Sequence, residues 1–112
     1  MSDKERTAAL VKALKDAEAF GGLSATLAEV EAHHPPEVIE ALWDGVRLRD
    51  GETAVHYAAM LLFLHGKAKS AFDWELRPFF LQFNTDDPEA RALACLELCA
   101  RIEEGPAGAP AK

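Results

Sequence analysis

The segment 50–66, DGETAVHYAAMLLFLHG, restricts the fold of this chain more than any other stretch. Between residues 54 and 64 only His56 is polar, and at about 100° per residue the apolar positions point in every direction around a helix. We therefore expect a helix that begins at the N-cap Asp50, ends at Gly66 and is covered by other helices on most sides. The apolar run is about half of the ~20 residues that cross a bilayer, so a buried core helix is favoured over a membrane span.

Capping signals predict two helices before this segment. Ser2 and Glu5 have the spacing of a capping box, and the periodic apolar residues that follow predict a helix to about Phe20. Thr26 and Glu29 have the same spacing and predict the start of a second, shorter helix. That helix should end before two consecutive prolines, because the residue before a proline avoids the α region.

Further helices are expected on both sides of Gly66. A third helix, 37–44, should end at Gly45, and a short link should fold it onto the central helix as an antiparallel hairpin. Pro78 can open a short apolar helix, and Asp87 is a strong N-cap for the last helix. The inward stripe of that last helix is predicted to be Cys95, Leu98, Cys99 and Ile102.

The length of 112 residues and the apolar fraction of 49% indicate one folded domain. We place this domain at residues 1–104. The remainder, 105–112, contains only Gly, Pro, Ala and one Lys. Because it lacks large side chains that could pack, we expect it to be disordered.

Acidic residues outnumber basic ones by 19 to 12, which gives a formal net charge of −7. Such a field repels nucleic acid and anionic lipid and favours a basic partner. The N-terminus has no apolar signal-peptide region, and Cys95 and Cys99 are poorly placed to form a disulfide with each other on one helix. We therefore expect a cytoplasmic protein that binds neither nucleic acid nor membrane.

The central and last helices resemble each other at an offset of 35 residues. A period of this length is typical of two-helix repeats. The alignment places Val55, His56, Ala59 and Phe63 over Ala90, Arg91, Ala94 and Leu98.

On these residues the chain resembles the HEAT-like family of α-helical repeats, over about residues 35–102. The second helix of that family begins with an Asp-Pro turn, followed by an aliphatic residue and Arg, then small residues and a leucine. This order is matched by Asp87, Pro88, Ala90, Arg91, Ala94 and Leu98, and less fully by Asp50, Val55, Ala58, Ala59 and Leu62. His56 stands where the family has Arg, and Ala90 replaces the aliphatic residue.

The resemblance and the helical patterns together predict an all-α fold. We expect a compact bundle of five or six helices with HEAT-like antiparallel helix hairpins, which is a short α-solenoid. The resemblance implies a binding surface rather than catalysis.

The histidines and cysteines provide little support for catalysis or a bound metal. His56 and His65 are nine residues apart, which puts them about 180° from each other on one helix, so they cannot share a metal ion. Buried thiols explain Cys95 and Cys99 better than zinc ligands do. Because no phosphate-binding loop, metalloprotease motif or nucleophile motif occurs, we expect no enzymatic activity, no cofactor and no metal.

The segment 72–75 has the clearest features of a recognition site. Aromatic side chains surrounded by charges are typical of binding hot spots, although packing of the aromatics on the core would explain the same pattern. Acids on the third helix should steer a basic partner to this segment. The predicted partner-binding residues are Glu37, Glu40, Asp44, Phe72, Asp73, Trp74 and Glu75.

We interpret the chain as a non-catalytic protein-binding module for a basic partner, similar in composition to immunity proteins that neutralise a bacterial toxin. One alternative is a scaffold or self-assembling subunit that uses an exposed apolar end of the helical stack. The other is a small metal-binding or enzymatic protein with His56 or the cysteines in a cleft. The oligomeric state stays open.

Overall fold

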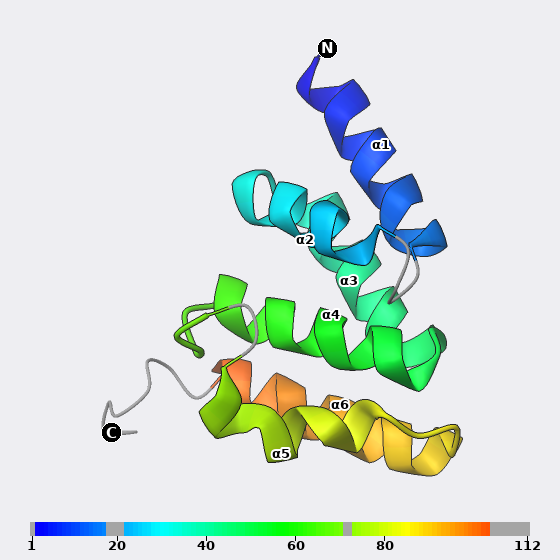
Figure 1. Cartoon of the computed structure of the whole chain (residues 1–112), viewed down its shortest axis with the longest axis vertical. Helices are drawn as coiled ribbons and strands as arrows, with labels where there is room; N and C mark the ends of the chain where they lie inside the picture. The colour runs from blue at the N-terminus through cyan, green and yellow to red at the C-terminus, as the bar shows by residue number, and fades with distance from the viewer. Residues whose placement is uncertain (1, 18–21, 71–72, 104–112) are drawn as a thin grey trace.

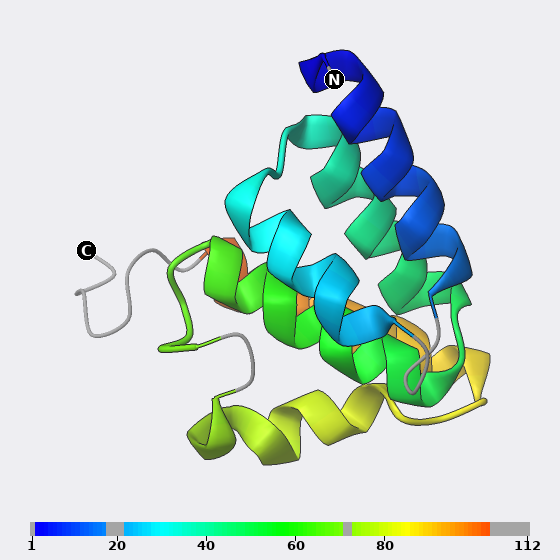
Figure 2. The same ribbon diagram turned by 45° about the horizontal axis from the view of Figure 1, so that its top comes forward.

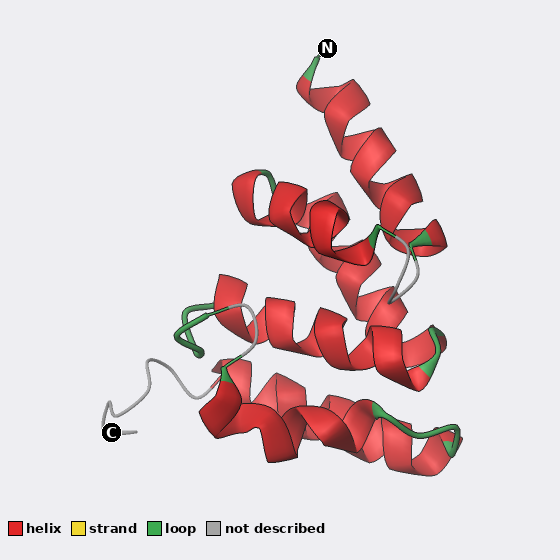
Figure 3. Cartoon of the chain, viewed as in Figure 1, coloured by secondary structure: helices red, strands yellow, loops and turns green. Residues whose placement is uncertain are grey.

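The computed structural model describes residues 2–17, 22–70 and 73–103, with the backbone alone at Trp74. These residues form six α-helices and two 3₁₀ helices and contain no β-strand (Figure 1, Figure 3). The all-α prediction is confirmed. In chain order the elements are α1 (Asp3–Asp16), α2 (Leu23–Ala32), α3 (Pro36–Leu48), α4 (Gly51–Leu64), η1 (Trp74–Leu76), α5 (Arg77–Phe80), η2 (Leu81–Phe83) and α6 (Pro88–Glu103).

Helix α4 is the buried central helix that the sequence predicts. Its N-cap Asp50 accepts hydrogen bonds from the backbone amide and the hydroxyl of Thr53, at 3.3 and 3.1 Å. Ten of its 14 residues are buried. In both ribbon views α4 lies between α3 on one side and α5 on the other (Figure 1, Figure 2). Within the described part of the chain, no helix has the length and apolar character needed to span a membrane.

Helix α1 begins as predicted but ends earlier. The capping box is present, with both reciprocal hydrogen bonds between Ser2 and Glu5. The helix ends at Asp16, and Ala17 is its extended C-cap. The predicted end at Phe20 lies outside the described residues.

The predicted start of the second helix is wrong. Helix α2 begins at Leu23, so Thr26 and Glu29 lie inside it. Its N-cap is Gly22, which has a left-handed φ of 91° that favours glycine. Leu23 is buried, so the earlier start places one more leucine in the core.

Helix α3 extends past the predicted stop at Gly45. It continues to Leu48, and Gly45 is buried within it. A β-carbon at this position would lie 2.1 Å from Cδ2 of Tyr57, so the glycine permits close packing of α3 on α4 rather than ending a helix. The chain turns at Arg49 and Asp50, and α4 runs back from this turn at an angle to α3 (Figure 2).

Helix α6 starts as predicted, because the Asp87 carboxylate accepts the backbone amide of Glu89 at 3.1 Å. The predicted inward stripe is only partly correct. Leu98 is buried, whereas Cys99 is exposed. Cys99 lies about 100° around the helix from Leu98, which turns it to solvent. The buried residues of α6 are Arg91, Ala94 and Leu98.

Candidate functional site

Three of the predicted carboxylates lie along one face of α3. Glu37, Glu40 and Asp44 occur at i, i+3 and i+7, which places them on the same side of a helix. Glu37 and Glu40 are exposed, and among the described residues neither forms an ion pair. Asp44 is half-buried and lies 3.0 Å from the Arg47 guanidinium. We call these three residues the α3 acidic face.

The second group of predicted residues lies in the segment before α5. Phe72 is outside the described residues, and of Trp74 only the backbone is described, at the start of η1. Glu75 is exposed and pairs with the Lys69 amine at 2.9 Å. This hydrogen bond raises the pKa of Lys69.

Asp73 does not have the exposed position that a steering charge requires. Its side chain is buried, with 8% of the residue exposed. The carboxylate accepts the backbone amides of Lys69 at 3.2 Å and Glu75 at 3.0 Å. Through these two hydrogen bonds Asp73 links Lys69 to Glu75 of η1.

The α3 acidic face and Glu75 belong to different parts of the fold. Glu37, Glu40 and Asp44 belong to α3, whereas Glu75 belongs to η1, directly before α5. In both ribbon views α4 lies between these two parts of the chain (Figure 1, Figure 2). The predicted partner-binding residues are therefore spread over two parts of the fold, and a common binding face near Trp74 stays a prediction.

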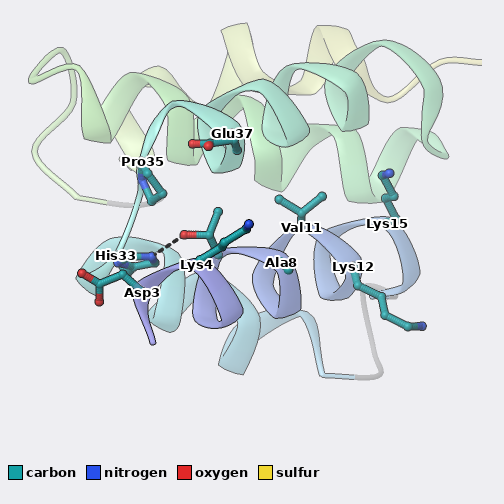
Figure 4. Close-up of a pocket in the computed structure, with 10 residues that line it drawn as sticks. Asp3, Lys4, Ala8, Val11, Lys12, Lys15, His33, Pro35 and Glu37 are labelled. Atoms are coloured by element: carbon teal, nitrogen blue, oxygen red, sulfur yellow. Dashed lines mark hydrogen bonds between the residues drawn. The ribbon is translucent and has the colours of Figure 1, made fainter. Parts of the chain in front are cut away.

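Sequence reasoning missed a groove between α1 and the start of α3. The groove has a volume of about 740 Å³. Ala8 and Val11 of α1 and Pro35 provide its apolar surface, and Lys4 and Lys15 lie toward opposite ends of α1 (Figure 4). Glu37 of the α3 acidic face also lines it, together with Asp3, Thr7, Lys12 and His33. The sequence feature that could have predicted this groove is a second face of α1, which carries Ala8 and Val11 and points in a different direction from the buried Leu10 and Leu14.

One side-chain pair in the groove has the composition of a nucleophile and its base. The Thr7 hydroxyl and Nε2 of His33 are 2.8 Å apart (Figure 4). Nucleophilic catalysis also needs a group that orients the imidazole. The pair links α1 to the end of α2, because Thr7 belongs to α1 and His33 is the C-cap of α2.

The remaining histidines and the thiols are dispersed. Nδ1 of His34 bonds to the backbone carbonyl of Val30 at 2.9 Å. Cys95 is half-buried, and burial raises the pKa of its thiol, while Cys99 is exposed. Over residues 2–17, 22–70 and 73–103, no group of three or more His, Cys, Asp or Glu residues is placed to hold a metal ion.

Comparison of this chain with protein-family models, with curated proteins and with solved structures finds no match. The HEAT-like resemblance therefore stays a prediction, based on the residues around Asp87 and Arg91.

Proposed function

We propose that this protein is a non-catalytic protein-binding module that recognises a basic partner through the α3 acidic face. The observation that supports the proposal is the exposure of Glu37 and Glu40 on one side of a regular helix, without ion pairs among the described residues. Immunity proteins that neutralise a basic toxin are one class of protein with this kind of surface.

Electrostatics would act at two ranges in such a complex. The formal charge of −7 attracts a basic partner over about 10 Å at 0.1 M salt, which raises the association rate. Contacts with the α3 acidic face would then orient the partner. Added salt should therefore slow association more than it accelerates dissociation.

Two synthetic amphipathic peptides test this proposal. Both have the same leucine and alanine positions, and one has lysine and the other glutamate at every polar position. We expect the lysine peptide to shift the backbone amide resonances of α3 in an NMR titration of the isotopically labelled protein, and the glutamate peptide to leave them unchanged. Shifts confined to other helices, or no shifts, would contradict the proposal.

A matched pair of variants separates the site from the overall charge. The site variant combines Glu37→Gln, Glu40→Gln and Asp44→Asn. The control combines Glu31→Gln, Glu52→Gln and Asp86→Asn, three exposed acids on other parts of the chain. An ion pair between a peptide lysine and one carboxylate of the α3 acidic face contributes about 0.5 kcal/mol of binding free energy. Because the site variant removes three such carboxylates, it should bind the lysine peptide about tenfold more weakly. An equal loss in the control would show that only net charge matters.

A further inference from the structure

The outer face of α6 is apolar along its length and acidic at both ends. Leu93 and Leu96 are 62% and 67% exposed. Ala100 is exposed one turn after Leu96, and Glu89 and Glu103 are exposed at the two ends of the row. We call this row the α6 stripe: Glu89, Leu93, Leu96, Ala100 and Glu103. Its spacing of i, i+4, i+7, i+11 and i+14 places all five residues on one side of the helix.

The groove between α1 and α3 contains a row with the same intervals and the opposite charge. Lys4, Ala8, Val11 and Lys15 of α1 occur at i, i+4, i+7 and i+11 and all line the groove (Figure 4). The small side chain of Ala8 leaves room for a larger one from a docked helix. Lysines therefore stand at both ends of this row, where the α6 stripe has glutamates.

The lengths of the two rows are compatible. At about 1.5 Å per residue, Lys4 and Lys15 are about 16 Å apart along α1, and Glu89 and Glu103 are about 21 Å apart along α6. The flexible lysine side chains can reach across this difference. Asp3 and Glu37 line the groove near Lys4 (Figure 4), so the attraction for an acidic helix end is strongest at Lys15.

We propose that the α6 stripe of one copy of this chain docks into the α1–α3 groove of a second copy. Helices α1 and α6 lie at opposite ends of the molecule's longest axis (Figure 1). The contact would therefore join the α6 end of one copy to the α1 end of the next. Each added copy leaves one groove and one stripe free. Assembly therefore continues into an open chain of copies, unless the rotation between successive copies closes a ring.

Direct pairing of two α6 stripes is less favourable. With the helices antiparallel, Glu89 of each copy would face Glu103 of the other, and with the helices parallel each glutamate would face itself. Acids would meet acids in both arrangements, which is destabilising. The other exposed large apolar residues of the described chain, Leu48 and Leu81, are on different elements and have no such neighbour on the same face.

A mixing experiment with the full chain distinguishes this contact from other modes of association. The groove variant is Ala8→Glu with Lys15→Glu, and the stripe variant is Leu93→Gln with Leu96→Gln; apart from the changed residues, each leaves the other surface intact. Sedimentation velocity should show that the wild-type mass increases with protein concentration and that each variant alone stays monomeric. An equimolar mixture should form a dimer that does not grow, because only one intact groove and one intact stripe remain.

The control variant is Leu48→Gln with Leu81→Gln, which removes two exposed leucines elsewhere. It should associate like the wild type. Circular dichroism and the urea midpoint verify that all variants fold. A wild-type chain that stays monomeric at millimolar concentration would overturn the proposal. So would a groove variant that still associates alone, since that result indicates stripe-to-stripe pairing, or a control that loses association.

Discussion

The ring of Tyr57 lies directly against the backbone of Gly45, and a β-carbon at Gly45 would come within 2.1 Å of Cδ2 and 2.4 Å of Cε2. Both residues are buried, one in α3 and the other in α4. The close packing of these two helices at Gly45 therefore depends on the absence of a single methyl group.

Replacement of Gly45 with Ala should destabilise the protein. Alanine improves helix propensity by about 1 kcal/mol, but overlap with a buried aromatic ring forces the two helices apart. We expect the free energy of unfolding, measured by urea titration, to fall by about 1–3 kcal/mol. An increase of about 1 kcal/mol would mean that propensity dominates and that α3 and α4 separate without cost.

Tyr57 should also make stability depend on alkaline pH. Its hydroxyl donates a hydrogen bond to the Leu14 carbonyl at 2.5 Å. Burial raises the pKa of Tyr57, and the charge of Arg49 opposes this effect only in part. The unfolded chain then loses the phenol proton at lower pH than the folded chain. The contribution is complete below about pH 10 and is lost as the pH rises above it.

Comparison of the wild type with Tyr57→Phe isolates this titration from that of the lysines. At about pH 8 the variant should be less stable by about 1 kcal/mol, because the hydrogen bond is lost. Between about pH 8 and pH 11 the unfolding free energy of the variant should fall less than that of the wild type. Parallel curves would assign the alkaline loss to other groups.

The helix starts that the sequence predicts correctly are set by neighbouring residues. Ser2, Asp50 and Asp87 accept amides within the next few positions, so their capping role can be recognised from local spacing. The strongly apolar character of α4 likewise predicts its burial. These features need no knowledge of which helices meet.

The features that the sequence did not predict depend on distant contacts. Glycine is common at helix ends, so the sequence predicts a stop at Gly45. Its role in the close packing of α3 on α4 becomes visible only when Tyr57 lies beside it. The groove exists because Val11 of α1 and Pro35 before α3 are brought together. In the sequence Asp73 has the features of an exposed acid. In the structure it is buried, and its carboxylate accepts the amides of Lys69 and Glu75.

Asp73 should therefore contribute to stability and not to binding. Loss of the acceptor in Asp73→Ala leaves two backbone amides without their partner, and we expect unfolding to become easier by about 1–3 kcal/mol. Glu75→Ala is the control, because its ion pair with Lys69 is exposed and should contribute no more than about 1 kcal/mol. If Asp73→Ala left stability unchanged but weakened binding of the lysine peptide, Asp73 would be a recognition residue instead.

Arg91 joins two parts of the chain that α4 separates in sequence. Its guanidinium donates to the carbonyls of Val46 at 3.0 Å, Arg49 at 2.9 Å and Thr85 at 2.6 Å, so it ties the C-terminal end of α3 to the loop before α6. Only 8% of the residue is exposed. The HEAT-like resemblance implies an arginine at this position.

Arg91→Lys should lower the free energy of unfolding by about 3 kcal/mol, because a lysine amine cannot reach three carbonyls from one position and leaves buried acceptors unpaired. The control is Arg6→Lys, whose ion pair with Glu29 at 3.1 Å is largely exposed and should change stability by less than about 1 kcal/mol. Urea titrations of both variants compare the two sites directly. Equal, small effects would show that the charge at residue 91 is sufficient. A large effect at Arg91 alone would show that the planar geometry of the guanidinium holds the end of α3 and the loop before α6 together.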